Sequence, residues 1–78
     1  MAILVTDRTP RATKIKFTAD EMTVELADGR RISVPLAWFP RLASASQAQL
    51  ANYELMADGE GIHWPDLDED LSVEGLLK

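Results

Sequence analysis

A two-residue alternation of apolar and polar side chains between residues 13 and 34 is the feature that most limits how this chain can fold. Apolar side chains stand at odd positions in the first stretch and at even positions in the two that follow. They are Ile15 and Phe17, then Met22, Val24 and Leu26, then Ile32 and Val34. This period is typical of half-buried strands. We therefore predict an antiparallel three-stranded meander, with strands at about 13–19, 21–27 and 30–35.

The parity of these positions also predicts the connections, because a slip of one residue would turn a whole apolar set toward water. The second and third strands share even parity, so an odd loop must join them. Ala27-Asp28-Gly29 fits, with Gly29 in a left-handed conformation. The first loop must be even, and residues 18–21 suit it because Ala19-Asp20 alone lacks glycine or asparagine. The resulting register places Ile15 and Ile32 opposite Val24, Phe17 and Val34 opposite Met22, Lys14 and Arg31 opposite Glu25, and Ser33 opposite Thr23.

The residues after the third strand are expected to cover one face of this sheet. Trp38 and Phe39 come first, and we predict that both lie over the core; the alternative is an exposed aromatic patch that binds a partner. Two overlapping capping boxes then begin at Ser44 and Ser46, each with a glutamine three residues later. They predict a short helix at about 47–53.

The end of the chain completes the predicted cover. Asp58-Gly59-Glu60-Gly61 is expected to form a turn, since alternating glycines permit positive φ angles and close backbone approach. Ser72 is placed to cap one helical turn at about 73–77. We predict one α+β domain over residues 1–78, with residues 1–12 forming either a flexible arm or an edge strand.

Charge is distributed unevenly along the chain, whose formal net charge is −5. Residues 1–41 carry 7 Lys and Arg against 5 Asp and Glu, or +2, whereas residues 42–78 carry 1 against 8, or −7. An acidic half repels phosphate backbones and attracts basic partners, so direct nucleic-acid binding through it is disfavoured. The chain lacks cysteine, and its apolar start ends at Thr6, too early for a signal peptide or a membrane span. We expect a cytoplasmic protein.

The acidic stretch at residues 61–77 matches no metal or cofactor motif. Aspartates stand at every second position from Asp66, as in a calcium loop, but Leu71 and Leu77 occupy the places where that loop needs glycine and glutamate. His63 is the only histidine, so it has no second imidazole or thiolate with which to share a transition metal. The glycines also miss the spacing of phosphate-binding loops. We predict neither a metal nor a cofactor.

A catalytic role for His63 is a further alternative. Asp66 or Asp68 would orient the imidazole as a general base. No hydroxyl stands in a recognisable nucleophile context, because caps, turns and strand faces account for Ser72 and the others. We expect the protein not to be an enzyme, and we assign no catalytic residue.

The leading interpretation is that the acidic stretch binds a basic protein, with one aromatic anchor supplying affinity and the carboxylates speeding encounter. The predicted contact residues are Trp64, Asp66, Asp68, Glu69, Asp70 and Glu74. The alternative is a nucleic-acid-binding or autoregulatory protein that uses the cations of the N-terminal half. These cations are Arg8, Arg11, Lys14, Lys16, Arg30 and Arg31.

Three stretches resemble a family of small, mostly bacterial proteins catalogued as domain of unknown function 2442. They read VELADGRRISVPLAWFPRL, which ends in PLAWFPRL; QLANYEL, which contains ANYEL; and GIHWPDLDEDLSVEGLL. Together they span most of Val24 to Leu77, and their ordered combination makes the resemblance specific. Only about the first dozen residues look particular to this chain.

The resemblance implies a small α+β domain and no known catalytic residues. It also implies that the gene lies beside one for another small protein, in an arrangement like a toxin and antitoxin pair. The chain would then be the antitoxin-like member and would bind a basic partner encoded nearby. Self-association stays an open alternative, because a meander leaves two edge strands.

Overall fold

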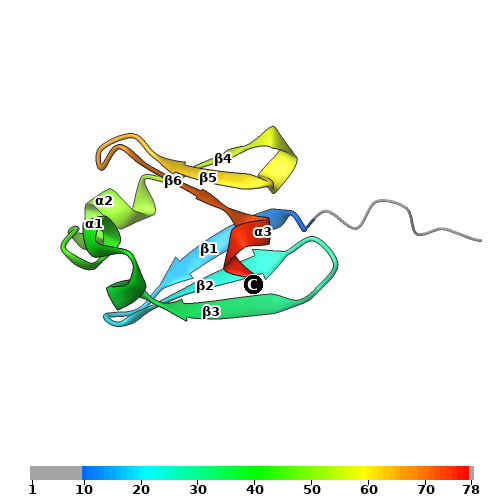
Figure 1. The fold of residues 1–78 in the computed structure, drawn as a ribbon, viewed down its shortest axis with the longest axis horizontal. Helices are drawn as coiled ribbons and strands as arrows, with labels where there is room; N and C mark the ends of the chain where they lie inside the picture. The colour runs from blue at the N-terminus through cyan, green and yellow to red at the C-terminus, as the bar shows by residue number, and fades with distance from the viewer. Residues whose placement is uncertain (1–9, 78) are drawn as a thin grey trace, which may run out of the picture.

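The computed structural model describes residues 10–77, which form two three-stranded antiparallel sheets joined by short helical segments (Figure 1). The first sheet contains β1 (Ala12–Phe17), β2 (Glu21–Leu26) and β3 (Arg31–Pro35), and the second contains β4 (Glu54–Met56), β5 (Gly61–Trp64) and β6 (Glu69–Ser72). The helical segments are η1 (Leu36–Trp38), α1 (Pro40–Ala43), α2 (Gln47–Ala51), η2 (Ala57–Gly59) and α3 (Val73–Leu76). The α+β class and the three-stranded meander are confirmed.

The first sheet has the register that parity predicts. Val24 pairs with Ile15 on one side and with Ile32 on the other, and Glu25 pairs with Lys14 and Arg31. A bulge in β1 between Ala12 and Lys14 is the one irregularity in these two ladders, and the pattern did not signal it. Ala12 is the first residue of β1, while the part of the arm-or-edge-strand expectation that falls on residues 1–9 lies outside the described residues.

The two hairpin turns also follow the parity argument. Gly29 has a φ of +95°, and its N–H donates to the carbonyl of Leu26 at 3.0 Å, which closes the three-residue loop. In the four-residue turn, the N–H of Thr18 donates to the carbonyl of Glu21 at 2.9 Å. The Thr18 hydroxyl in turn accepts from the N–H of Glu21 at 3.0 Å. Side-chain hydroxyls of this kind stabilise turns that lack glycine.

The helical segments are shorter than predicted. Ser46 forms the capping box with Gln49, so α2 begins where expected, but it ends at Ala51 because Asn52 leaves the helical conformation. Ser44 does not cap α2. It follows the last residue of α1, and its hydroxyl donates to the carbonyl of Pro40, the first residue of α1. Ser72 caps α3 as predicted, accepting from the N–H of Gly75. Within residues 10–77 no helix combines the length and apolar character that a membrane span requires.

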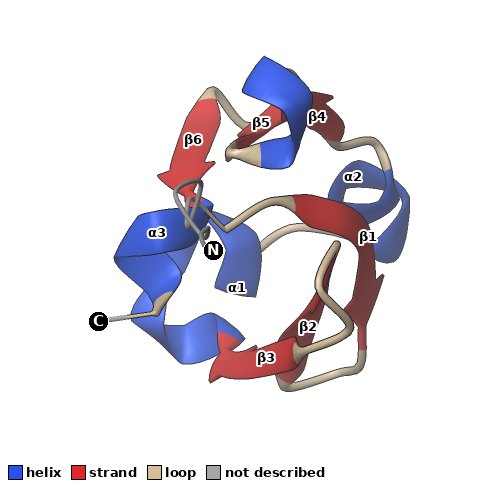
Figure 2. Cartoon of the chain, turned by 90° about the vertical axis from the view of Figure 1, so that its right-hand side faces the viewer, coloured by secondary structure: helices blue, strands red, loops and turns tan. Residues whose placement is uncertain are grey.

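The second sheet is a feature that the sequence analysis missed. It lies over the first sheet, and α3 lies between β6 and β3 (Figures 1 and 2). Leu55, Ile62 and Leu71 form one cross-strand row, and Ile62 and Trp64 are buried. The core between the sheets consists of Ala12, Ile15, Met22, Val24, Leu26, Val34, Leu36, Leu42, Leu50, Ile62, Trp64 and Val73.

Gly59 and Gly29 provide a matched pair for testing how η2 rests on β1. Both have positive φ angles, but a Cβ on Gly59 would overlap the carbonyl oxygen of Ala12, whereas one on Gly29 would meet nothing within 4 Å. We predict that Gly29→Ala lowers the free energy of unfolding by about 1–2 kcal/mol, through backbone strain alone. Gly59→Ala should cost at least about 3 kcal/mol, because η2 must also shift. Urea denaturation followed by circular dichroism measures both, and equal losses would contradict the prediction.

Candidate functional site

The predicted acidic contact residues lie on one continuous segment that runs through the β5–β6 turn, β6 and α3. Asp66 and Asp68 are in the turn, Glu69 and Asp70 are on β6, and Glu74 is in the first turn of α3. All except the half-buried Glu69 are exposed. Among residues 10–77, Asp70 is the only one of the five that forms an ion pair, and its partner is His63. We call these five carboxylates the acidic segment.

Two hydrogen bonds attach the β5–β6 turn to the helical layer. Asn52 Nδ2 donates to the carboxylate of Asp66 at 3.0 Å, and the guanidinium of Arg41 donates to the backbone carbonyl of Asp68 at 2.6 Å. Asp68 itself has a φ of +53°, a conformation that aspartate tolerates better than most residues. Arg41 therefore tethers the backbone of the turn at Asp68, and Asn52 holds the carboxylate of Asp66.

Trp64 cannot be the exposed aromatic anchor that the sequence analysis expected. Its side chain is fully buried, and its indole N–H donates to the carbonyl of Leu50 at 3.0 Å. Its ring also meets the ring of Phe17 edge to face, with 6.5 Å between centroids. Trp64 holds the two sheets together, so a partner could reach it only if the core opened.

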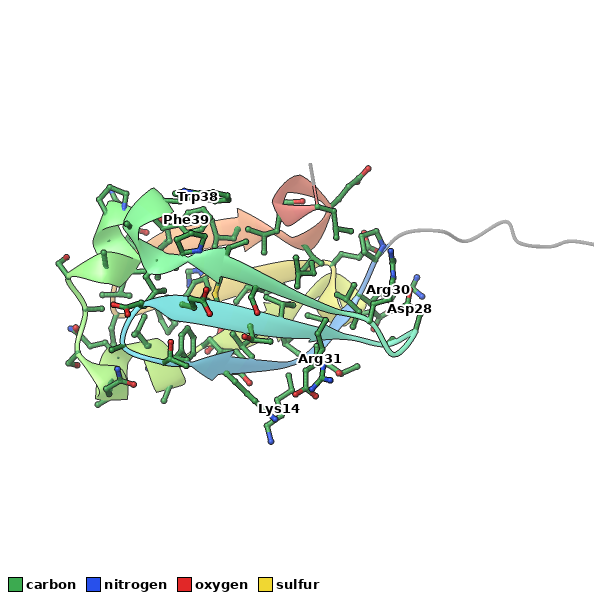
Figure 3. All side chains as sticks on the ribbon, turned by 90° about the horizontal axis from the view of Figure 1, so that it is seen from below. Lys14, Asp28, Arg30, Arg31, Trp38 and Phe39 are labelled. Atoms are coloured by element: carbon green, nitrogen blue, oxygen red, sulfur yellow. The ribbon has the colours of Figure 1, made fainter. Side chains whose placement is uncertain are left out.

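Trp38 has the exposure that was expected of Trp64. The prediction that Trp38 lies over the core is wrong, because 67% of its surface is exposed, whereas Phe39 is half-buried and packs on the core. Figure 3 shows the two rings next to each other where the chain leaves β3. Covering a largely exposed tryptophan on binding gains a large apolar area, and tryptophan is enriched among the residues that dominate binding energy at interfaces.

A groove of about 380 Å³ runs between β3 and η1 on one side and β6 and α3 on the other. It is lined by Val34, Trp38, Phe39, Asp70, Leu71, Ser72, Gly75 and Leu76. Its volume is near the lower end of the range for sites that bind small molecules, about 300–1,000 Å³. Asp70 belongs to both this groove and the acidic segment, so the two form one continuous surface.

His63 and Asp70 form a cross-strand pair on β5 and β6, with 2.5 Å between Nδ1 and the carboxylate. The imidazole is therefore oriented by Asp70, and neither Asp66 nor Asp68 is its partner as the catalytic alternative supposed. Glu54 on β4 is opposite His63 in the same row. Within the described residues no group of three or more His, Asp and Glu side chains could hold a metal ion.

The cations of the N-terminal half lie on a different face. Lys14 and Arg31 project from the side of the first sheet away from Trp38 (Figure 3). Carboxylates neutralise two of these cations, because Lys16 pairs with Glu25 at 3.0 Å, and Arg30, in the β2–β3 turn, pairs with Asp28 at 2.7 Å. Arg8, the first cation of the nucleic-acid alternative, lies outside the described residues.

The same ion pairs lower the pKa values of two carboxyl groups, those of Glu25 and Asp28. A hydrogen bond from Lys16 lowers the pKa of Glu25 below its ordinary 4.5, and the charges of Lys14 and Arg31 act in the same direction. Hydrogen bonds from the backbone N–H and the guanidinium of Arg30 lower the pKa of Asp28. Both carboxylates are thus better satisfied ionised than protonated.

Comparison with known proteins supports the resemblance seen in the sequence. The sequence model of a family described as "Protein of unknown function (DUF2442)" matches residues 12–78. None of the curated proteins matches the chain.

Two solved structures are similar. A crystal structure of a protein of unknown function from Rhodospirillum rubrum has a TM-score of 0.75 and 36% identity, over 87% of this chain and 84% of that one. A solution NMR structure of an uncharacterised protein from Chromobacterium violaceum has a TM-score of 0.72 and 23% identity, over 86% of this chain and 63% of that one. At that identity the second likeness concerns the fold alone.

The two tryptophans should respond differently to substitution. Trp64→Phe removes a buried hydrogen bond and core volume, so we predict a loss of about 2–4 kcal/mol in the free energy of unfolding. Trp38→Phe should change it by less than about 0.5 kcal/mol. Acrylamide quenching checks the assignment: the single tryptophan left in Trp38→Phe should be shielded, and the one left in Trp64→Phe accessible. The reverse pattern would contradict the assignment.

The lowered pKa of Glu25 predicts the direction in which the stability of the fold changes with pH. Because folding lowers its pKa, ionised Glu25 stabilises the fold above its ordinary value of 4.5, and that contribution is lost as the pH falls through the folded-state pKa. Lys16→Gln should raise the pKa of Glu25 toward 4.5, and Lys14→Gln should raise it less, because only Lys16 donates a hydrogen bond. Carboxyl ¹³C titration by NMR measures both values. Equal rises would show that charge alone sets the pKa.

Proposed function

The chain belongs to the DUF2442 family, and we propose that it is a non-catalytic protein-binding module whose acidic segment docks a basic protein. The observation that carries the proposal is the continuity of this segment with an apolar groove and the exposed ring of Trp38. Interfaces commonly combine an aromatic anchor with a charged rim. Trp38 takes the anchor role that the sequence analysis gave to Trp64.

Charge supports a basic partner. Residues 42–78 carry 1 positive and 8 negative side chains, or −7, and five of the eight belong to the acidic segment. Exposed carboxylates attract a cationic surface over about one Debye length, roughly 8–10 Å, and so raise the association rate. The tethered turn keeps Asp66 and Asp68 in fixed positions, which limits the entropy lost on binding.

We propose that the partner is the product of a neighbouring gene and that this chain is the antitoxin-like member of a bacterial two-gene pair in the cytoplasm. The support is the resemblance described above together with the lack of cysteine, which suits a reducing compartment. Self-association through an edge strand of the first sheet is a competing proposal. Pro35 on β3 counts against pairing at that edge, because proline offers no N–H to a neighbouring strand.

The two other functions receive less support from the geometry. The cations that would contact phosphates include Lys16 and Arg30, whose charges are already paired with carboxylates. For catalysis, Asp70 orients His63, but the hydroxyl nearest in sequence, that of Ser72, accepts a hydrogen bond as the cap of α3. These observations favour binding over chemistry.

Neutralising the acidic segment should weaken binding to the neighbouring gene's product. We predict that the combined change Asp66→Asn, Asp68→Asn and Asp70→Asn lowers affinity at least about tenfold at low salt, mainly through a slower association rate. Surface plasmon resonance at several salt concentrations separates the two rate constants. The difference from the unmodified protein should shrink as salt rises.

A matched control carries the same change in net charge elsewhere. Asp20→Asn, Glu21→Gln and Asp58→Asn also remove three exposed carboxylates, but from the β1–β2 turn, β2 and η2, which lie outside the acidic segment. This variant should bind within about threefold of the unmodified protein, since screening limits the reach of distant charges. Equal losses in the two variants would assign the effect to net charge and contradict the proposed surface.

A further inference from the structure

The groove beside Trp38 has a lining that selects for one kind of side chain. Its walls are apolar at Val34, Phe39, Leu71 and Leu76, and its polar side chains are Asp70 and Ser72. A ligand that fills it must therefore have an apolar stem and a polar head. A positive head fits best, because the carboxylate of Asp70 is the charged group of the lining.

Asp70 is held in place for such a contact. His63 Nδ1 lies 2.5 Å from Oδ1, and within residues 10–77 no side chain or backbone donor contacts the other oxygen, Oδ2. The Asp70 side chain is 75% exposed. One oxygen thus fixes the carboxylate while the other faces solvent, so a cation can bind there without displacing His63.

Trp38 supplies a second contact for a cation. Its ring lines the same groove and is mostly exposed. A guanidinium stacks on an indole face and pairs with a carboxylate in its own plane, whereas an ammonium is more strongly hydrated and forms point contacts. A groove that combines an indole, a carboxylate and apolar walls therefore prefers arginine to lysine.

Side-chain insertion also fits the backbone around the groove better than strand addition does. Pro35 follows Val34 on β3 and removes a donor from that edge. On the opposite side, α3 begins directly after β6, so the strand is only Glu69–Ser72. Neither edge next to the groove offers a long row of backbone groups.

We propose that this groove binds an arginine side chain of the partner, with the guanidinium between Trp38 and Asp70 and the stem along Phe39 and Leu76. The inference rests on the proposed function and names the residue of the basic partner that the module reads. Charge complementarity favours the partner as occupant: the groove opens onto a segment of five carboxylates, and its exposed aromatic ring is uncovered.

Peptide titration followed by NMR tests the proposal without the natural partner. The probes are blocked Leu-Arg-Leu, Leu-Lys-Leu and Leu-citrulline-Leu, the last of which has nearly the shape of arginine but no charge. The indole N–H signal of Trp38 reports on the groove, and that of the buried Trp64 serves as an internal control. We expect saturable shifts at Trp38 with arginine, at least about fivefold weaker binding of lysine, and no saturation with citrulline.

Two variants and one control complete the experiment. Asp70→Asn and Trp38→Leu should each weaken binding of the arginine peptide at least about fivefold. Trp38→Leu is followed through the backbone amides of Leu76 and Gly75, which line the groove. Asp66→Asn removes the same charge from the same segment but does not line the groove, so it should have less than about a twofold effect. The Trp64 signal confirms that each variant is folded.

Several outcomes would overturn the proposal. Equal affinity for the citrulline and arginine peptides would contradict the proposed guanidinium contact. So would equal losses of affinity in Asp70→Asn and Asp66→Asn. If the indole N–H signal of Trp38 shifted with protein concentration and not with added peptide, the groove would be assigned to a second copy of the chain. Failure here is distinct from failure of the proposed function: the neighbouring protein would still lose affinity when Trp38 is replaced or the acidic segment is neutralised, although the peptides would show no preference for arginine.

Discussion

The burial of Trp64 between the two sheets is the interaction on which the rest of the structure depends. Within residues 10–77 each sheet has three short strands, and its apolar face must be buried against another layer. Trp64 comes from the second sheet, meets Phe17 of the first, and donates its indole N–H to Leu50 of α2. One side chain thus joins the two sheets and the helical layer and leaves no unsatisfied donor. A polar group buried this deeply would destabilise the fold without that acceptor.

The position of Trp64 in turn determines where the groove forms. It anchors β5 over the first sheet, and β6 pairs with β5, so β6 lies beyond the anchored strand at the edge of the second sheet. The short helix α3 lies between that edge and β3 (Figure 2), and residues of β3, β6 and α3 line the groove. The groove is the part that α3, one helical turn long, leaves uncovered. The groove therefore follows from the way the two small sheets pack.

Much of the first sheet could be predicted because period and parity are local properties of the sequence. Ile15, Val24 and Ile32 had to share a face, and that requirement made the first loop even and the second odd. Turn chemistry then selected the loop lengths, and the lengths determine the register. The second sheet could not be found in the same way. Its strands have three or four residues, and β4 begins with Glu54. Ile62 and Trp64 do alternate around His63, but two positions are too few to establish a period. That alternation was nevertheless the signal that Trp64 faces inward.

In the candidate site, too, some features follow from the local sequence and others depend on how the strands pair. The exposure of Asp66, Asp68, Asp70 and Glu74 followed from composition, because acidic side chains rarely enter a core. Which of them has a fixed geometry did not follow, since that depends on pairing between strands. Asp66 and Asp68 lie in a turn, whereas Asp70 is on β6 opposite His63 and also lines the groove. Carboxylates outside the groove mainly accelerate encounter, while one placed beside apolar walls can discriminate between ligands. We therefore assign the selectivity of the proposed surface to the groove that Asp70 and Trp38 both line, two residues that are 32 positions apart in the sequence.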